Sequence, residues 1–169
     1  MFSDQYNNMF PSWSNDGESI YFNSSREKSE EIWNYNLEDK SFKRITDDDG
    51  QYGQVNNDGY FYYTRKTAPY IWRKQVGENK PEMFFNKVHR EDFNNWKVIN
   101  NNIYFFRRTG SAASICVYNF KTQKETTLYT YGEKSKSYKM MMDIADNEKV
   151  LCFSSLERLE IDLMEIALE

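Results

Sequence analysis

Short apolar segments alternate with polar turn clusters along the whole chain. The clusters are Asn15-Asp16-Gly17, Asn57-Asp58-Gly59, Asn100-Asn101-Asn102 and Asp146-Asn147, and the apolar segments that follow them are SIYFNSS, YFYYTR, NIYFFRR and KVLCFSS. Asn, Asp and Gly tolerate the positive φ that tight hairpin turns require. Each cluster is therefore predicted to join two antiparallel strands.

A second series of apolar segments keeps the same phase. It reads IWNYNL, IWRKQV, ICVYNF and IDLMEI, and its leading isoleucines, Ile32, Ile71, Ile115 and Ile161, lie 39, 44 and 46 residues apart. A third series, FKRIT, PEMFF and TTLYT, follows only the first three copies. Four antiparallel strands every ~40–45 residues are typical of a β-propeller blade.

The sequence thus predicts an all-β chain of about four blades, each a four-stranded antiparallel sheet, with the last blade incomplete. The expected blades lie at approximately residues 8–47, 51–86, 94–131 and 137–168, within one partial propeller domain over residues 1–169.

The apolar positions of the third strands fall on both faces. In a strand, Ile32 points away from Trp33 and Tyr35, and Ile115 points away from Cys116. Apolar groups on both faces indicate a sheet covered on both sides, as a blade between two neighbours is.

The C-terminal segment also permits a helix, because Leu156, Leu159, Leu163 and Ile166 recur at spacings of three and four. Its position relative to the three earlier repeats instead favours a strand that spans the segment LEIDLMEIA.

Composition narrows the class of protein. Aromatic residues make up 17% and charged residues 28% of the 169 residues, which is typical of a folded, β-rich chain. A net charge of −4 without a basic cluster argues against direct nucleic-acid binding.

No apolar stretch approaches the roughly 20 residues that span a bilayer, so we expect no membrane insertion by this chain. We see no signal peptide at the N-terminus. Cys116 and Cys152 are expected to be reduced core residues.

The first copy resembles the WD40-like repeat of TolB-type β-propellers. The matching residues are Trp13-Ser14, Asp16-Gly17, Ile20-Tyr21-Phe22, Ser24, Arg26, Glu31-Ile32-Trp33, Asn36-Leu37 and Arg44-Ile45-Thr46. In the C-terminal half, NNWKVINNNIYFFRR, ICVYNFKTQKETTLY, DIADNEKVLCFSS and EIDLMEI resemble the end of the propeller in CadC-like transcriptional regulators. Those regulators carry a winged-helix DNA-binding domain, usually a membrane span, and then a sensory propeller.

The resemblance implies a non-catalytic module that binds a ligand or a protein, as the sensory domain of a CadC-like regulator does. It implies a periplasmic location if the parent chain is membrane-anchored, and a cytoplasmic one otherwise. The alternative is a gating or filter propeller of a prolyl-oligopeptidase-type or TolB-like system whose other domains lie outside this chain. A structural or assembly role is a third possibility.

Catalytic and metal-binding signals are sparse. His89 is the only histidine and no G-x-S-x-G motif occurs, so we expect no enzyme activity. Asp47, Asp48 and Asp49 precede a glycine without the further ligands of an EF-hand, and an acidic loop between blades is expected. We expect no metal and no cofactor.

Residues that recur at the repeat spacing are expected to serve the scaffold. Arg26 and Glu31 flank one loop and are expected to form an ion pair, with Arg65 and Arg107 at similar places. Four tryptophans recur in pairs, Trp13 with Trp96 and Trp33 with Trp72, and are expected to pack blades together.

Non-repeating residues on the connectors between blades are the candidates for ligand or partner binding, because loops on rigid scaffolds often bind. They are Asp48, Tyr52, His89, Arg90 and Trp96.

An arc of blades exposes the flanks of its first and last blade, which favours association. We expect a second copy or the remainder of a longer propeller to cover these flanks, and a closed four-bladed ring is a third option. Residues 1–9 are a candidate for the outer strand that the last blade lacks.

Overall fold

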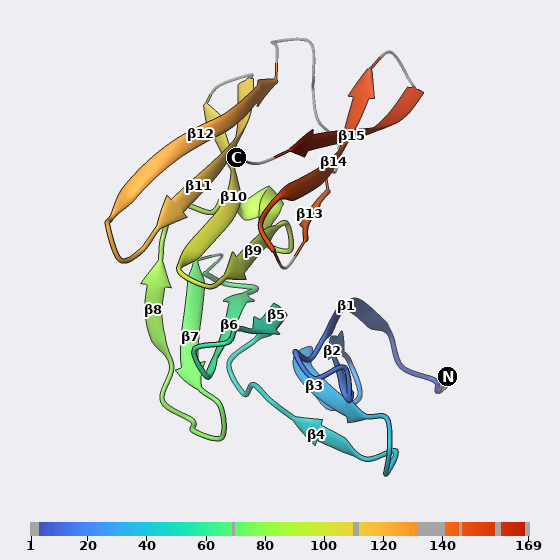
Figure 1. The fold of residues 1–169 in the computed structure, drawn as a ribbon. Coiled ribbons are helices and arrows are strands. Elements are labelled where there is room, and N and C mark those ends of the chain that lie inside the picture. The colour runs from blue at the N-terminus through green and yellow to red at the C-terminus, as the bar shows by residue number, and fades with distance from the viewer. Residues whose placement is uncertain are drawn as a thin grey trace. The chain divides into compact units, whose positions relative to one another are not determined.

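The computed structural model describes residues 4–68, 70–109, 112–131, 141–145, 147–157 and 160–167. Strands dominate, and in the described part of the chain one short 3-10 helix, η1, accompanies them (Figure 1). The chain divides into two compact units, Met1–Asn86 and Lys87–Glu169. The blade limits expected from the sequence, and a single domain, stay predictions.

Unit 1 holds two four-stranded antiparallel sheets. Blade 1 consists of β1 (Asn8–Trp13), β2 (Ser19–Ser24), β3 (Glu31–Asn36) and β4 (Phe42–Arg44), in that spatial order. Blade 2 consists of β5 (Gly50–Val55), β6 (Tyr60–Arg65), β7 (Ile71–Gln75) and β8 (Glu82–Phe85).

Unit 2 begins with η1 (Arg90–Asp92) and holds one four-stranded and one three-stranded sheet. Blade 3 consists of β9 (Trp96–Ile99), β10 (Asn102–Thr109), β11 (Ala112–Asn119) and β12 (Lys124–Tyr131). Blade 4 consists of β13 (Met142–Ile144), β14 (Val150–Glu157) and β15 (Glu160–Ala167). The prediction of four antiparallel blades is confirmed, and the last blade holds three strands within the described residues. The prediction of a strand rather than a helix at β15 is also confirmed.

The turns between the first two strands of each blade carry the expected backbone. Gly17 and Gly59 have φ of 73° and 83°, and Asn100 has φ of 52°. In blade 4 the positive φ, 56°, falls on Glu148, while Asp146 lies outside the described residues. The turn of blade 1 touches that of blade 2, where Asn15 Nδ2 donates to Asn57 Oδ1 at 2.9 Å.

The two-faced pattern of β3 is confirmed by the packing of blade 1. On one face, Trp33 and Tyr35 pack with Phe22. On the other face, Ile32 packs with Phe61 and Tyr63 of blade 2. In unit 2 the β11 residues Ile115 and Val117 pack in one cluster with Leu151 and Phe153 of blade 4, while Cys116 is buried. Both cysteines are free thiols.

The N-terminal segment departs from expectation. Residues 4–7 form no strand, and Asn8 and Met9 pair with Ser24 and Asn23 inside blade 1. A β-bulge follows, at which Phe10 has φ of 54° and the register shifts before Ser12. The expectation of one outer strand over residues 1–9 for blade 4 is therefore wrong.

Trp13 and Arg26 also differ from the scaffold roles expected of them. Trp13, at the end of β1, is 62% exposed and is not a packing residue of unit 1. Arg26 forms its ion pair with Asp4 at 2.8 Å, and its guanidinium lies 3.9 Å from the ring centroid of Phe42. The expected pair with Glu31 does not form, and Arg44 pairs with Glu31 instead.

The described residues contain no helix long and apolar enough to cross a membrane.

Candidate binding grooves within the two units

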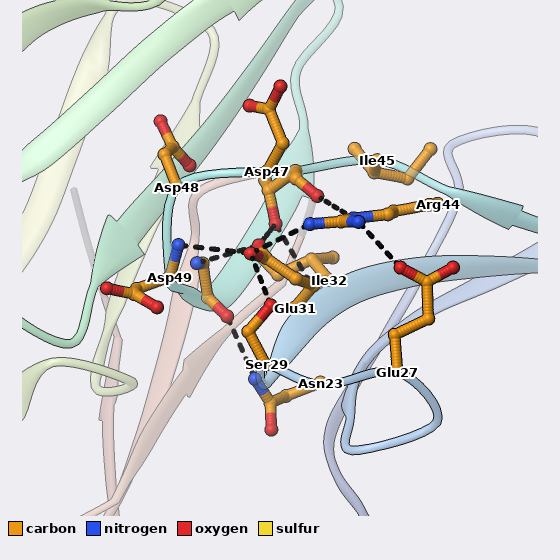
Figure 2. A network of polar contacts seen from close by, with 12 residues as sticks. Asn23, Glu27, Ser29, Glu31, Ile32, Arg44, Ile45, Asp47, Asp48 and Asp49 are labelled. Carbon is orange, nitrogen blue, oxygen red and sulfur yellow. Dashed lines mark hydrogen bonds and ion pairs between the residues drawn. The ribbon is translucent and has the colours of Figure 1, made fainter.

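A buried carboxylate fixes the connector between blades 1 and 2. Glu31, at the start of β3, is 1% exposed. It accepts hydrogen bonds from Thr46 Oγ1 at 2.6 Å and from the backbone N–H groups of Asp49 and Gly50 at 3.3 Å, and Arg44 pairs with it at 3.2 Å (Figure 2). Charge-assisted bonds of this kind are stronger than neutral ones, so they hold the chain where it turns from β4 into β5.

Strand β5 approaches the face of blade 1 closely. Ser12 Oγ donates to the Gly53 carbonyl at 2.5 Å, and Asn23 Nδ2 donates to the Gly50 carbonyl at 2.8 Å. A Cβ on Gly53 would lie 2.5 Å from Cζ of Phe61. The absence of a side chain at Gly53 therefore leaves room for Phe61 of the same blade, which packs with Ile32 and Tyr21 of blade 1.

Two of the candidate site residues, Asp48 and Tyr52, belong to unit 1. The Asp48 carboxylate pairs with Arg65 at 2.5 Å and accepts from the Tyr63 hydroxyl at 2.7 Å. Burial raises the pKa of the Tyr63 phenol, and the Asp48 carboxylate raises it further. Tyr52 is 6% exposed, and its carbonyl accepts from Thr64. Both residues take part in contacts within blade 2.

The other three candidates, His89, Arg90 and Trp96, belong to unit 2. His89 and Arg90 are exposed, and His89 Nδ1 accepts from the backbone N–H of Glu91 at the start of η1. Trp96 is 1% exposed, and its Nε1 donates to the Phe93 carbonyl at 2.8 Å. The five candidates thus belong to two units, and their role in ligand or partner binding stays a prediction.

A groove of about 490 Å³ lies between blades 1 and 2. Tyr21 and Phe61 line it, with ring centroids 5.1 Å apart. Asn34 and Lys43 stand beside Tyr21 in one row across β2, β3 and β4, and Lys74 stands beside Phe61 on β7. The groove thus combines aromatic surface with amide and ammonium donors.

Lys74 is the least expected side chain of this groove. It is 7% exposed, and its Nζ donates to the carbonyl of Ile45. Burial lowers the pKa of its ammonium, while the carboxylates of Asp48 and Asp47 oppose that shift and Lys43 adds to it. The sequence could not single out Lys74, because no repeat position or motif marks it.

The acidic run next to this groove is held by neighbours. Asp47 accepts from Asn79 Nδ2 at 2.9 Å, and Asp48 is paired with Arg65. Among the residues that the structure describes, no cluster of His, Cys, Asp and Glu side chains is arranged to hold a metal ion.

Unit 2 has a groove of about 580 Å³ between blades 3 and 4. There Glu148 accepts from Asn100 Nδ2, Asn102 Nδ2 and the Tyr104 hydroxyl, each at 2.6 Å. Partial burial raises the pKa of the Glu148 carboxyl, but the hydrogen bonds from Tyr104 and the two asparagines outweigh it, and the net pKa is lowered. The acidic side chain of this groove is therefore already satisfied.

Comparisons with known proteins bear on the fold. No protein-family model matches the chain, and no curated protein matches it. Among solved structures, TolB from Acinetobacter baumannii matches 98% of this chain with a TM-score of 0.71 and 20% identity. A putative TolB from Agrobacterium tumefaciens matches 98% with a TM-score of 0.73 and 12% identity. The chain has a TolB-like β-propeller fold.

A puromycin hydrolase also matches, over 93% of this chain, with a TM-score of 0.61 and 10% identity. The chain spans 41% and 60% of the two TolB chains and 26% of the hydrolase. At such identities the likeness is one of fold.

Proposed function

We propose that this chain is a non-catalytic β-propeller module that recognises a ligand or a protein segment. In this proposal it is the sensory part of a CadC-like regulator, located in the periplasm if the parent chain is membrane-anchored and in the cytoplasm otherwise. The TolB-like fold is compatible with this role, and the resemblance of the C-terminal half to CadC-like propellers motivates it.

The observation that carries the proposal is the groove of unit 1. Two of the donors that line it, Lys43 and Asn34, have no side-chain acceptor among the described residues, whereas Glu31, Asp48 and Glu148 are all engaged by the scaffold. Open donors beside an aromatic surface suit recognition of a ligand, since binding sites combine apolar walls with a few polar groups.

A binding experiment tests the proposal. A ¹⁵N-labelled sample of the full chain is titrated at pH 7 with a chemically mixed fragment set of neutral amides, sugars, amines and organic acids, and with short peptides. We expect saturable amide shifts in β2, β3 and β7 around the groove. Saturable shifts confined to other surfaces, or none with any probe, contradict recognition at this groove.

A gating propeller for a hydrolase is the second candidate, and the match to part of a puromycin hydrolase favours it. The coding region around this chain separates the two proposals. An upstream winged helix supports the sensory role, whereas a downstream G-x-S-x-G domain supports the gate.

A further inference from the structure

We propose that the groove of unit 1 binds an organic carboxylate with an apolar body, the carboxylate lying between Lys43 and Lys74 and the body against Tyr21 and Phe61. This inference rests on the proposed recognition function and names its ligand class. A free organic acid and the C-terminal carboxylate of a peptide share this chemistry.

The first argument is the hydrogen-bonding capacity of Lys74. An ammonium has three N–H donors, and the Ile45 carbonyl accepts from it. Lys74 is only 7% exposed, so water solvates it poorly. Buried charges are costly unless they are paired. The carboxylates of Asp48, Asp47 and Glu31 act on Lys74 from a distance, but no described side chain forms a direct ion pair with it. A ligand carboxylate in the groove would supply that pair.

The second argument is the position of Lys43. It stands on the edge strand β4, in register with Asn34, and both line the same groove as Lys74. Burial is the main cause that lowers the pKa of Lys74 and Lys43 adds to it, while the carboxylates of Asp48, Asp47 and Glu31 oppose the shift. An anion between the two ammonium groups attracts both, and the Asn34 amide offers a further donor.

The third argument concerns the charge and shape of the ligand. Arg44 also lines the groove, but its guanidinium is occupied by Glu27 at 2.6 Å and by Glu31 at 3.2 Å. The carboxylates of Asp47 and Glu78 line the groove as well and repel a doubly charged anion. Two lysines without a free arginine fork therefore favour a single carboxylate over a phosphate.

The fourth argument is the apolar surface. Tyr21 and Phe61 meet at 5.1 Å between ring centroids, and Ile45 and Val76 extend the apolar lining. A volume of about 490 Å³ lies in the range of small-molecule pockets. The groove accordingly fits an aryl or alkyl chain that ends in a carboxylate.

The test is an amide-shift titration of the full chain with 3-phenylpropionate and with 3-phenylpropionamide, its neutral match. A second pair is acetyl-Gly-Gly-Phe with a free carboxyl group and with a C-terminal amide. We expect both acids to shift amides of β2, β3 and β7, and each amide to bind at least about tenfold more weakly. If only one acid binds, it identifies the source of the carboxylate.

Variants locate the interaction. Lys43→Met and Lys74→Met are each expected to weaken acid binding about tenfold. Lys28→Met, at an exposed position away from the groove, is expected to leave binding unchanged. Lys43 is exposed, so its variant remains informative even if Lys74→Met does not fold.

Equal binding of acid and amide, or full binding by Lys43→Met, overturns the carboxylate assignment. If neutral or cationic probes shift the groove while acids do not, the carboxylate assignment fails and the recognition function stands. If no class of probe shifts the groove, both fail.

Discussion

The two units join their blades by different means. In unit 1 the connector into β5 is fixed by the buried Glu31, and the backbone of Gly53 lies directly against blade 1. In unit 2 the half-buried Glu148 reaches from the turn of blade 4 to blade 3 through three side-chain hydrogen bonds.

Two tyrosines at the same repeat position show the consequence. Tyr104 donates its hydroxyl to Glu148, whereas Tyr21 packs its ring against Phe61. Two lysines line each groove, Lys43 and Lys74 in unit 1 and Lys124 and Lys149 in unit 2. The grooves differ in that Tyr104 is bonded to a carboxylate, whereas Tyr21 presents its ring. A shared repeat therefore sets the sheets, and individual cross-blade residues set what each groove can bind.

Removal of the buried carboxylate of unit 1 is expected to have the largest effect. Glu31→Ala leaves the Thr46 hydroxyl and two backbone N–H groups without their acceptor, and should lower the free energy of unfolding by about 3 kcal/mol. Urea unfolding followed by tryptophan fluorescence measures it. Glu30→Ala, which removes an exposed ion pair with Lys66, is the control and should cost less than about 1 kcal/mol. Equal losses would contradict the importance of burial.

The second-largest loss of stability is expected when a methyl group is added at Gly53. Gly53→Ala brings a Cβ to 2.5 Å from Phe61 and should cost about 2 kcal/mol through overpacking. The double variant Gly53→Ala with Phe61→Leu should show a favourable coupling, because the smaller side chain leaves room for the methyl group. Strict additivity of the two losses in urea unfolding would refute the steric explanation.

The Glu148 carboxylate of unit 2 is expected to make the free energy of unfolding depend on pH. The folded pKa of Glu148 is lowered, so its contribution to stability is present above the unfolded pKa and is lost as pH falls through the folded one. Glu148→Gln should lower the free energy of unfolding by about 1 kcal/mol at pH 7. The difference in unfolding free energy between Glu148→Gln and the wild type should disappear as the pH falls below about 4.5, the region of an unperturbed Glu pKa. Urea midpoints at pH 7, 5, 4 and 3 measure it, and a constant gap would be the contrary result.

The smallest expected effect is the difference in stability loss between Tyr104→Phe and Tyr21→Phe. Tyr104→Phe loses a hydrogen bond to a carboxylate and should cost about 1 kcal/mol. Tyr21→Phe keeps its ring contact with Phe61 and should change stability by less than about 0.5 kcal/mol. Equal costs in urea unfolding would remove the proposed distinction between the grooves.

The repeat made the strands predictable from sequence. Turn residues such as Gly17 and Gly59 act locally, through φ angles that few other residues adopt, so their spacing marks the hairpins directly. The alternation of Ile32 with Trp33 likewise follows from strand geometry and identified both packed faces of blade 1.

Contacts across blades were not predictable in the same way. Arg26 and Glu31 are close in sequence, yet Arg26 stacks on Phe42 and Glu31 binds the connector at Thr46 and Gly50. Lys74 became a candidate only once its row was placed beside Tyr21 and Asn34. Such partners depend on the register of strands far apart in the chain, which the local pattern does not encode.

The contacts between neighbouring turns keep each pair of blades aligned although the repeats differ in length. Asn15 meets Asn57 in unit 1, and Asn100 meets Glu148 in unit 2, each joining the same turn of successive copies. Because these turns stay level with one another, added or deleted residues must be absorbed by other loops of the blade. A repeat whose turn is hydrogen-bonded to that of the next blade can therefore change in length during evolution without disturbing the packing of the two blades.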